Sequence, residues 1–148
     1  MANYAENRKA RFNYEILEKY ETGIELLGTE VKSVRGGQVS LEGAFVIIRG
    51  GEAFLINANI PPYQPKNADK DYDPLRNRKL LLTKKEITEL ADSEKNESLT
   101  IVPISVYNKG RKIKVEIALV KGKKKFDKRE TIKKRETDRE VRREYKER

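Results

Sequence analysis

Apolar and polar residues alternate along several stretches of this chain, and the alternation predicts most of its regular structure. Within residues 112–120 every odd position is apolar, and the first three even positions are Lys or Glu. A period of two indicates a strand with one buried face. The same alternation begins a second predicted strand, over residues 12–27. Strands are also predicted over the apolar stretches 44–49, 53–57 and 99–107.

Glycine and proline mark where these strands bend or end. Gly50-Gly51 separates two predicted strands and is typical of a tight hairpin turn. Gly23 predicts a bend or bulge in the long first strand, because a missing Cβ eases sharp coiling there. Pro103 has no amide hydrogen to donate, so it predicts an edge position or a bulge in its strand.

Two stretches have the features of helices. Thr83-Lys-Lys-Glu86 matches a capping box, in which the Thr hydroxyl and the Glu carboxylate bond each other's amides, and it predicts a helix over 84–95. Residues 29–35 predict a short helical turn that Thr29 caps and Gly36-Gly37 ends.

Together these elements predict a mainly β fold with five to six strands, one covering helix and a short second helix. A small barrel of the oligonucleotide-binding (OB) type is the leading architecture. An open sandwich is the alternative, since periodicity does not separate the two. Residues 1–120 are expected to form one domain with a basic N-terminal arm over residues 1–11, followed by a tail over 121–148.

Charge divides the chain at the same boundary. Residues 121–148 contain 14 Lys or Arg and 7 Asp or Glu, so the tail carries +7 of the total +9. With so few apolar residues, the tail is expected to be disordered when free and helical once docked on phosphates. A pI near 9.6 with clustered cations favours a polyanion, most often nucleic acid. An anionic membrane and simple solubility are the alternatives.

Several functional classes are excluded by residues that the sequence lacks. There is no Cys and no His, so zinc fingers, thiol nucleophiles and Ser-His-Asp triads are not possible. Asp69, Asp71 and Asp73 alternate as in a calcium loop, but the Gly and Glu that an EF-hand needs are Pro74 and Leu80 here. Neither catalysis, a cofactor nor a metal is therefore expected. A soluble intracellular protein is expected, because there is no signal-peptide core and no apolar run of about 20 residues.

Two basic stretches are candidate binding surfaces on the residues alone. One contains Arg76, Arg78 and Lys79, whose side chains suit phosphate oxygens. The other is Asn7-Arg-Lys-Ala-Arg11. Tyr14 and Tyr63 are candidates for stacking on bases. Each stretch also fits a solvated surface without a partner.

Five stretches, in order, resemble motifs of the SsrA-binding protein (small protein B) family of bacterial trans-translation. They are Asn7–Arg11, Gly28–Arg35, Asp73–Leu82, Lys114–Ala118 and Gly122–Arg129. The resemblance implies an OB barrel that binds the tRNA-like domain of transfer-messenger RNA (tmRNA) and enters stalled ribosomes with it. It also implies a cytoplasmic, non-enzymatic monomer with no DNA or membrane partner, whose tail lies in the decoding centre and mRNA channel.

By the same resemblance, the positions tied to RNA binding are Asn7, Arg8, Tyr14, Glu21, Arg35, Leu81 and Lys114. The adjoining motifs add Arg11, Arg76, Arg78 and Lys79. The tail positions implied to contact the ribosome are Gly122, Lys123, Lys124, Asp127, Lys128 and Arg129.

The chain departs from the family pattern at three positions. Phe12 and Asn59 stand where the family usually has His, and Thr137 stands where it often has Trp.

A generic OB protein that binds single strands is the alternative function. A basic module that docks on an acidic protein is a further one.

Overall fold

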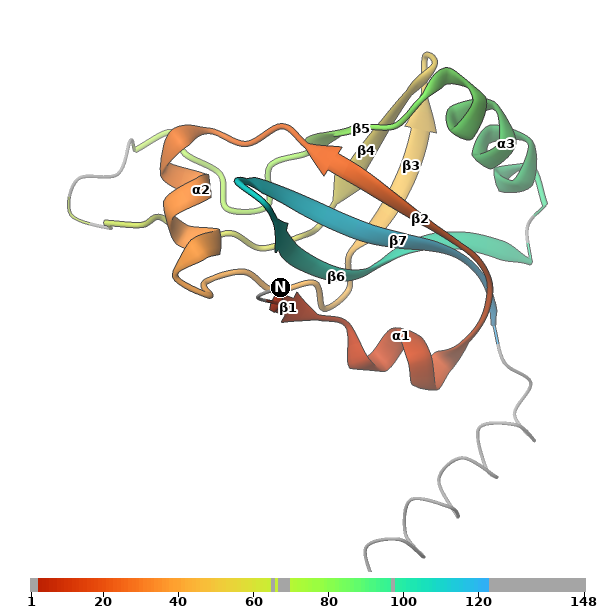
Figure 1. Cartoon of the computed structure of the whole chain (residues 1–148), viewed down its shortest axis with the longest axis horizontal. Coiled ribbons are helices and arrows are strands. Elements are labelled where there is room, and N and C mark those ends of the chain that lie inside the picture. Colours follow the sequence, from red (N-terminus) through yellow and green to blue (C-terminus); the bar gives the residue numbers. More distant parts are fainter. Residues whose placement is uncertain (1–2, 65, 67–69, 97, 123–148) are drawn as a thin grey trace, which may run out of the picture.

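The computed structural model describes residues 3–64, 66, 70–96 and 98–122, with seven strands and three helices in that part of the chain (Figure 1). The elements, in order, are β1 (Asn3–Glu6), α1 (Arg8–Asn13), β2 (Tyr14–Ile24), α2 (Gly28–Arg35), β3 (Phe45–Arg49), β4 (Glu52–Ile56), β5 (Arg78–Leu81), α3 (Lys84–Glu94), β6 (Leu99–Lys109) and β7 (Lys112–Gly122).

The strands close into a barrel. The antiparallel order β6-β3-β4-β5-β2-β7 returns to β6 through the β6–β7 pair, so six strands form a ring. A closed ring is the expected OB-type barrel and not the open sandwich. Its interior is apolar, with these side chains among the most buried: Leu55, Leu80, Ile101, Val115 and Ile117.

The N-terminal arm is folded, which the sequence did not predict. β1 pairs with β6 as a seventh strand, and α1 includes Phe12, which was expected to begin a strand. Asn7 accounts for the difference. Its side-chain oxygen accepts from the amide of Ala10 at 3.2 Å, its side-chain nitrogen donates to the Pro103 carbonyl at 3.0 Å, and its own amide donates to Ile104 at 2.7 Å. These bonds cap α1 and hold it on β6.

Two bulges interrupt the long strands. The register of β6 against β7 shifts between Pro103 and Ser105, which confirms the bulge expected at the proline. In β2 the shift lies between Ile16 and Glu18, not at Gly23 as predicted. Leu17 is the bulged residue, and it is 47% exposed.

The turn and capping predictions are largely confirmed. Gly50 and Gly51 have φ of 59° and 74°, the positive values of a type I′ hairpin turn. The Thr83/Glu86 capping box begins α3, one residue shorter at its end than expected. Thr29 does not cap α2, because that helix already begins at Gly28. The Glu30 carboxylate accepts from the Leu27 amide at 2.8 Å instead.

β7 extends two residues beyond the boundary expected for the domain. Lys121 and Gly122 pair with Glu15 and Tyr14 of β2, so the strand ends beside the end of α1. The tail beyond Gly122, with its predicted disorder and helix, lies outside the described residues.

Candidate nucleic-acid interface

The candidate interface is centred on Gly23, where β2 pairs with two strands at once. Gly23 is opposite Leu81 of β5 on one side and Lys114 of β7 on the other. In the sequence, Gly23 and Leu81 are 58 positions apart, and Leu81 and Lys114 are 33 positions apart. The barrel brings all three together. A Cβ on residue 23 would lie 3.2 Å from Cδ1 of Leu81, so glycine allows this leucine to pack closely over β2. Leu81 nevertheless remains 52% exposed.

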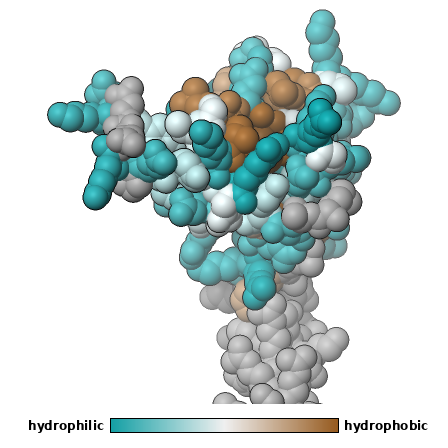
Figure 2. All heavy atoms as spheres, turned by 60° about the vertical axis from the view of Figure 1, so that its left-hand side comes forward, coloured by the Kyte–Doolittle hydropathy of each residue, from teal (hydrophilic) through white to brown (hydrophobic). Residues whose placement is uncertain are grey.

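A hollow of about 340 Å³ surrounds this junction and combines apolar and basic side chains. We call it the Gly23 hollow. Ile24, Leu26, Val31, Leu81 and Ile113 supply its apolar surface, and Arg35, Arg111, Lys112 and Lys114 supply its charge. On the α2 side of the molecule, Figure 2 shows apolar surface bordered by long hydrophilic side chains.

The cations of the Gly23 hollow are available to an anionic ligand. In the described part of the chain, no ion pair neutralises Arg35, Arg111, Lys112 or Lys114. Arg35 donates to the Arg111 carbonyl at 2.9 Å, which joins the end of α2 to the β6–β7 turn. Because the ionic surface is built from three separate elements, its shape is fixed by the barrel and not by one flexible segment.

Glu21, two residues before Gly23, is held by neighbours on β6. Its carboxylate accepts from the Tyr107 hydroxyl and from Lys109 Nζ at 2.9 Å. These two bonds hold the pKa of Glu21 below its ordinary value, and the bond from Tyr107 has the larger effect. Burial and the Glu21 bond raise the pKa of Tyr107. Glu21 therefore stays ionised and offsets Lys109 beside the hollow.

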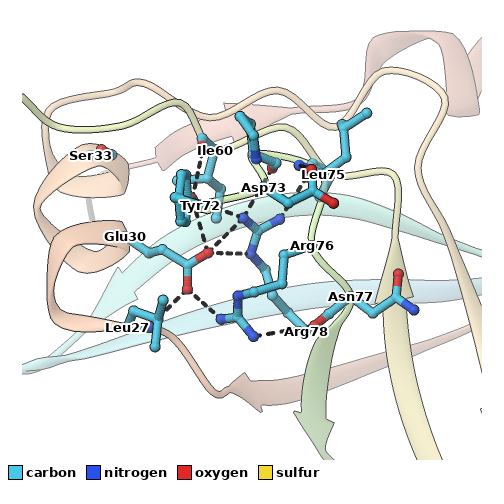
Figure 3. A network of polar contacts seen from close by, with 12 residues as sticks. Leu27, Glu30, Ser33, Ile60, Tyr72, Asp73, Leu75, Arg76, Asn77 and Arg78 are labelled. Atoms are coloured by element: carbon cyan, nitrogen blue, oxygen red, sulfur yellow. Dashed lines mark hydrogen bonds and ion pairs between the residues drawn. The ribbon is translucent and has the colours of Figure 1, made fainter. Parts of the chain in front are cut away.

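Arg78 is buried and does not lie on the surface, where the sequence prediction placed it. Its side chain is 0% exposed, and it contacts Glu30 through Nε at 2.8 Å and Nη2 at 2.6 Å. It also donates to the carbonyls of Ala58 at 2.7 Å and Pro74 at 3.0 Å (Figure 3). With its donors used inside the fold, Arg78 is a structural residue. This corrects its assignment as an RNA contact.

Glu30 is the centre of the network that Figure 3 shows. Burial alone raises the pKa of Glu30, but bonds from Arg76, the Leu27 amide and Arg78 outweigh burial and lower the pKa overall. Tyr72 also donates to Glu30 at 3.1 Å. The network ties α2 to β5, and it thereby fixes Arg35 relative to Leu81.

Arg76 and Lys79 are only partly available to a ligand. Arg76 pairs with Glu30, and its side chain is 35% exposed. Lys79 pairs with Glu52 at 3.1 Å on the surface, and this pair raises the pKa of Lys79. Neither residue lines the Gly23 hollow.

The predicted residues on the arm form a second region. Asn7 is half-buried and bonded to β6, Arg8 is exposed, and Tyr14 begins β2 opposite Gly122. Arg11 lies in α1. Nine residues of strand, about 30 Å, separate Tyr14 from Gly23. The structure thus places the end of α1, with the start of the tail, far from the Gly23 hollow, whereas β1 is nearer, because Asn3 pairs with Tyr107 and Tyr107 pairs with Lys114. Of the tail positions, Gly122 ends β7, and Lys123, Lys124, Asp127, Lys128 and Arg129 lie outside the described residues.

Sequence reasoning identified Arg35, Leu81 and Lys114 but missed the other residues that line the hollow, including Gly23, Arg111 and Lys112. Gly23 was interpreted as a bend, and Lys112 was assigned only to a strand. The sequence did contain an indication, since four cations occur between Lys109 and Lys114. Only the pairing of β7 with β2 shows which of them meet Leu81.

Other kinds of site find no support in the described part of the chain. Residues 3–64, 66, 70–96 and 98–122 contain no group of three or more Asp or Glu placed to hold a metal ion. No helix among them is long and apolar enough to span a membrane.

Comparison with known proteins identifies the family of this chain. The model of the family described as SmpB protein matches residues 4–147. This chain belongs to the SmpB family. Its SmpB relatives include the SsrA-binding protein of Mesoplasma florum, 56% identical over 95% of this chain and 94% of the relative. The SsrA-binding protein of Thermosynechococcus vestitus is 50% identical over 97% of this chain and 95% of the relative.

A solved structure supports the same SmpB assignment at the level of the fold. The chain is similar to one described as "tmRNA-SmpB: a journey to the center of the bacterial ribosome". The two share 44% sequence identity with a TM-score of 0.69, over 86% of this chain and 93% of the other.

Proposed function

We propose that this protein binds the tRNA-like domain of tmRNA and delivers it to stalled ribosomes for trans-translation. Two kinds of relative support the proposal: proteins named SsrA-binding protein, and a solved structure whose name joins tmRNA, SmpB and the ribosome. The observation that carries it is the meeting of Leu81, Lys114 and Arg35 around Gly23. All three match positions that the family resemblance ties to RNA binding.

The composition of the Gly23 hollow suits structured RNA. The four cations can contact phosphates, which supply most of the affinity in protein–RNA complexes. The exposed Leu81 side chain offers an apolar contact for a ribose or an unstacked base. Shape and backbone contacts of this kind recognise a folded RNA elbow, whereas a single strand would favour a row of aromatic platforms.

The proposal gives the basic tail a separate role. The body is close to neutral, and the residues beyond Gly122 contain 13 Lys or Arg against 7 Asp or Glu. We assign the tail to ribosomal RNA, where phosphate is dense, and the barrel to the tRNA-like domain. A non-catalytic adaptor that acts as a monomer in the cytoplasm follows from these partners.

Competition binding tests this function directly. The full-length chain is titrated with the labelled tRNA-like domain, and then challenged with the unlabelled domain or with single-stranded homopolymer RNA. We expect the domain to displace the label at far lower concentration than the homopolymer. Equal competition would instead identify a generic single-strand binder. A pull-down from cell extract that retains its partners after ribonuclease treatment would indicate a protein-docking module.

A further inference from the structure

A second hollow, of about 540 Å³, also borders α2 and shares no lining residue with the Gly23 hollow. We call it the Tyr63 pocket. Leu27, Pro61, Pro62, Tyr63 and Tyr72 supply most of its apolar lining. Leu27 and Tyr63 are 49% and 46% exposed, so large apolar side chains line this pocket at the surface. Its volume lies within the range of sites that bind small ligands or single groups of a larger one.

The floor of this pocket is held by the Glu30 network. The Tyr72 hydroxyl lies within hydrogen-bond distance of the Glu30 carboxylate, at 3.1 Å, and of the Ile60 carbonyl, at 2.7 Å, and Arg76 pairs with Glu30 (Figure 3). Ser33 of α2 donates to the Pro61 carbonyl at 2.8 Å. These bonds connect the lining of the pocket to the barrel. A ligand would therefore meet a preformed surface, and binding would carry a small entropic cost for ordering side chains.

The side chains around the pocket favour a flat and neutral group. Tyr63 offers a ring for stacking, and Lys32 Nζ lies 5.8 Å from the centre of that ring. Asp73 is also part of the lining, and its carboxylate accepts from the Leu75 amide at 2.9 Å. A phosphate would be repelled by Asp73. A nucleobase is uncharged, and its amino groups can donate to a carboxylate.

α2 connects this pocket to the proposed RNA site. Lys32 borders the Tyr63 pocket, and Arg35 borders the Gly23 hollow three residues later, so the two cations lie on neighbouring turns of one face. Similarly, Leu26 lines the Gly23 hollow, and the next residue, Leu27, lines the Tyr63 pocket. An RNA strand that contacts Arg35 would meet Lys32 next and then the pocket.

The geometry points to the Tyr63 pocket as a subsite that receives one unstacked base of the RNA bound at the Gly23 hollow. The base stacks on Tyr63, and Lys32 contacts the adjoining phosphate. This inference rests on the proposed function. It adds a base contact to a site otherwise made of phosphate and shape contacts, which is how structured RNAs are distinguished from one another.

The chain has no tryptophan, which allows a direct test with the full-length protein. Tyr63→Trp places the sole indole in the pocket, and Phe54→Trp places one on β4, outside the lining of both hollows, as a matched control. On titration with the tRNA-like domain, we expect the fluorescence at position 63 to be quenched by base stacking and that at position 54 to be unchanged. An unquenched position 63 at saturation would overturn the inference. Quenching by ribosomes but not by the isolated domain would also overturn it, in favour of another partner.

Affinity provides a second measure and separates this inference from the proposed function. Tyr63→Leu keeps the bulk of the side chain but loses the flat ring, and we expect it to weaken binding to the tRNA-like domain roughly ten-fold. Tyr63→Phe keeps the ring and should bind the domain like wild type. The salt dependence should not change, because no phosphate contact is removed. If Tyr63→Leu binds like wild type while Lys114→Ala is weakened, the base subsite is refuted and the function stands. If the wild-type protein does not bind the domain, the function itself fails.

Discussion

Glu30 has a carboxylate that is almost fully buried, and two arginines and one backbone amide bond to it. A buried charge of this kind is tolerated only while its partners remain, since removing one partner leaves the other uncompensated inside the protein. The bonds also connect α2, β5 and the wall of the Tyr63 pocket. At the residue scale, both proposed RNA contacts on α2 therefore depend on a side chain that does not touch RNA.

Glu30→Gln is expected to lower the free energy of unfolding by about 3–5 kcal/mol at neutral pH, because Arg78 loses its buried counter-charge. Urea denaturation measures this change. Glu52→Gln, which breaks the exposed pair with Lys79, is the matched control and should cost no more than about 1 kcal/mol. Equal losses in the two variants would show that the network has no special role.

The pH dependence of stability should change in the same variant. The pKa of Glu30 is lowered by folding, so its contribution is complete above the unfolded value of about 4.3 and is lost as pH falls through the folded value. Wild type should lose stability over that acidic range more steeply than Glu30→Gln does. Parallel curves for the two proteins below pH 4.3 would contradict this assignment.

Gly23→Ala tests the packing of Leu81 at the interface. The added Cβ would be 3.2 Å from Leu81 Cδ1, so the exposed side chain must shift by a few tenths of an ångström. We expect RNA affinity to fall several-fold, while stability changes by less than about 1 kcal/mol because the moved group is flexible. Gly28→Ala, whose Cβ would meet nothing within 4 Å, is the control for both binding and denaturation. Wild-type affinity in Gly23→Ala would argue against Leu81 as a contact.

At the scale of elements, α1 is a short helix whose stability depends on its neighbours. Six residues are too few for a helix that is stable alone, so α1 depends on its bonds to β6. These bonds use the Pro103 and Ile104 carbonyls at the β6 bulge, where the strand ladder is interrupted. The bulge at Pro103 thus lies where Asn7 bonds to β6.

Asn7→Ala is expected to cost about 1–2 kcal/mol, through the lost cap and the lost bond to Pro103. Hydrogen exchange should quicken at the amides of α1 and β1, while β3 and β4 keep their protection. Unchanged exchange together with weaker RNA binding would contradict this positioning role and make Asn7 a direct contact.

The sequence predicted the elements whose own residues determine them. Alternation located β7, the glycine pair located the β3–β4 hairpin, and Thr83 with Glu86 located α3. β1, α1 and β5 were not predicted, because each is short and is stabilised by partners distant in sequence. Arg78 was misassigned for the same reason. Its partner Glu30 is 48 residues away, and nothing local distinguishes a buried arginine from a solvated one.

For the site, resemblance to a family supplied Leu81, Lys114 and Arg35 but not their geometry. The apolar and basic residues of the hollow come from separate strands and a helix, so only barrel closure reveals which of them are neighbours. Gly23 and Arg111 could not be assigned in advance, since their roles arise from that closure.

At the scale of the whole molecule, β7 connects the two proposed contact regions. Its first residues, Lys112–Lys114, belong to the Gly23 hollow, and its last, Gly122, lies opposite Tyr14 beside α1. Eleven strand residues span about 35 Å. The tail therefore begins at the end of the barrel opposite the proposed RNA site, and the protein can contact two RNAs without competition between them.

Removing residues 123–148 should leave binding to the tRNA-like domain largely intact and abolish tagging of stalled peptides. The last described strand ends at Gly122, so the truncation leaves every described strand intact. Gel-shift assays measure the first outcome and a reconstituted translation assay the second. Loss of domain binding in the truncated protein would contradict the division between barrel and tail.

The salt dependence of binding to the tRNA-like domain tests the central claim most directly. Lys114→Ala is compared with Lys95→Ala, which removes an exposed cation on the far side, after α3. If Lys114 contacts a phosphate in the Gly23 hollow, its variant should bind more weakly, with a log–log slope shallower by about one. Lys95→Ala should match wild type. An unchanged affinity and slope for Lys114→Ala, or an equal loss at Lys95, would contradict the account.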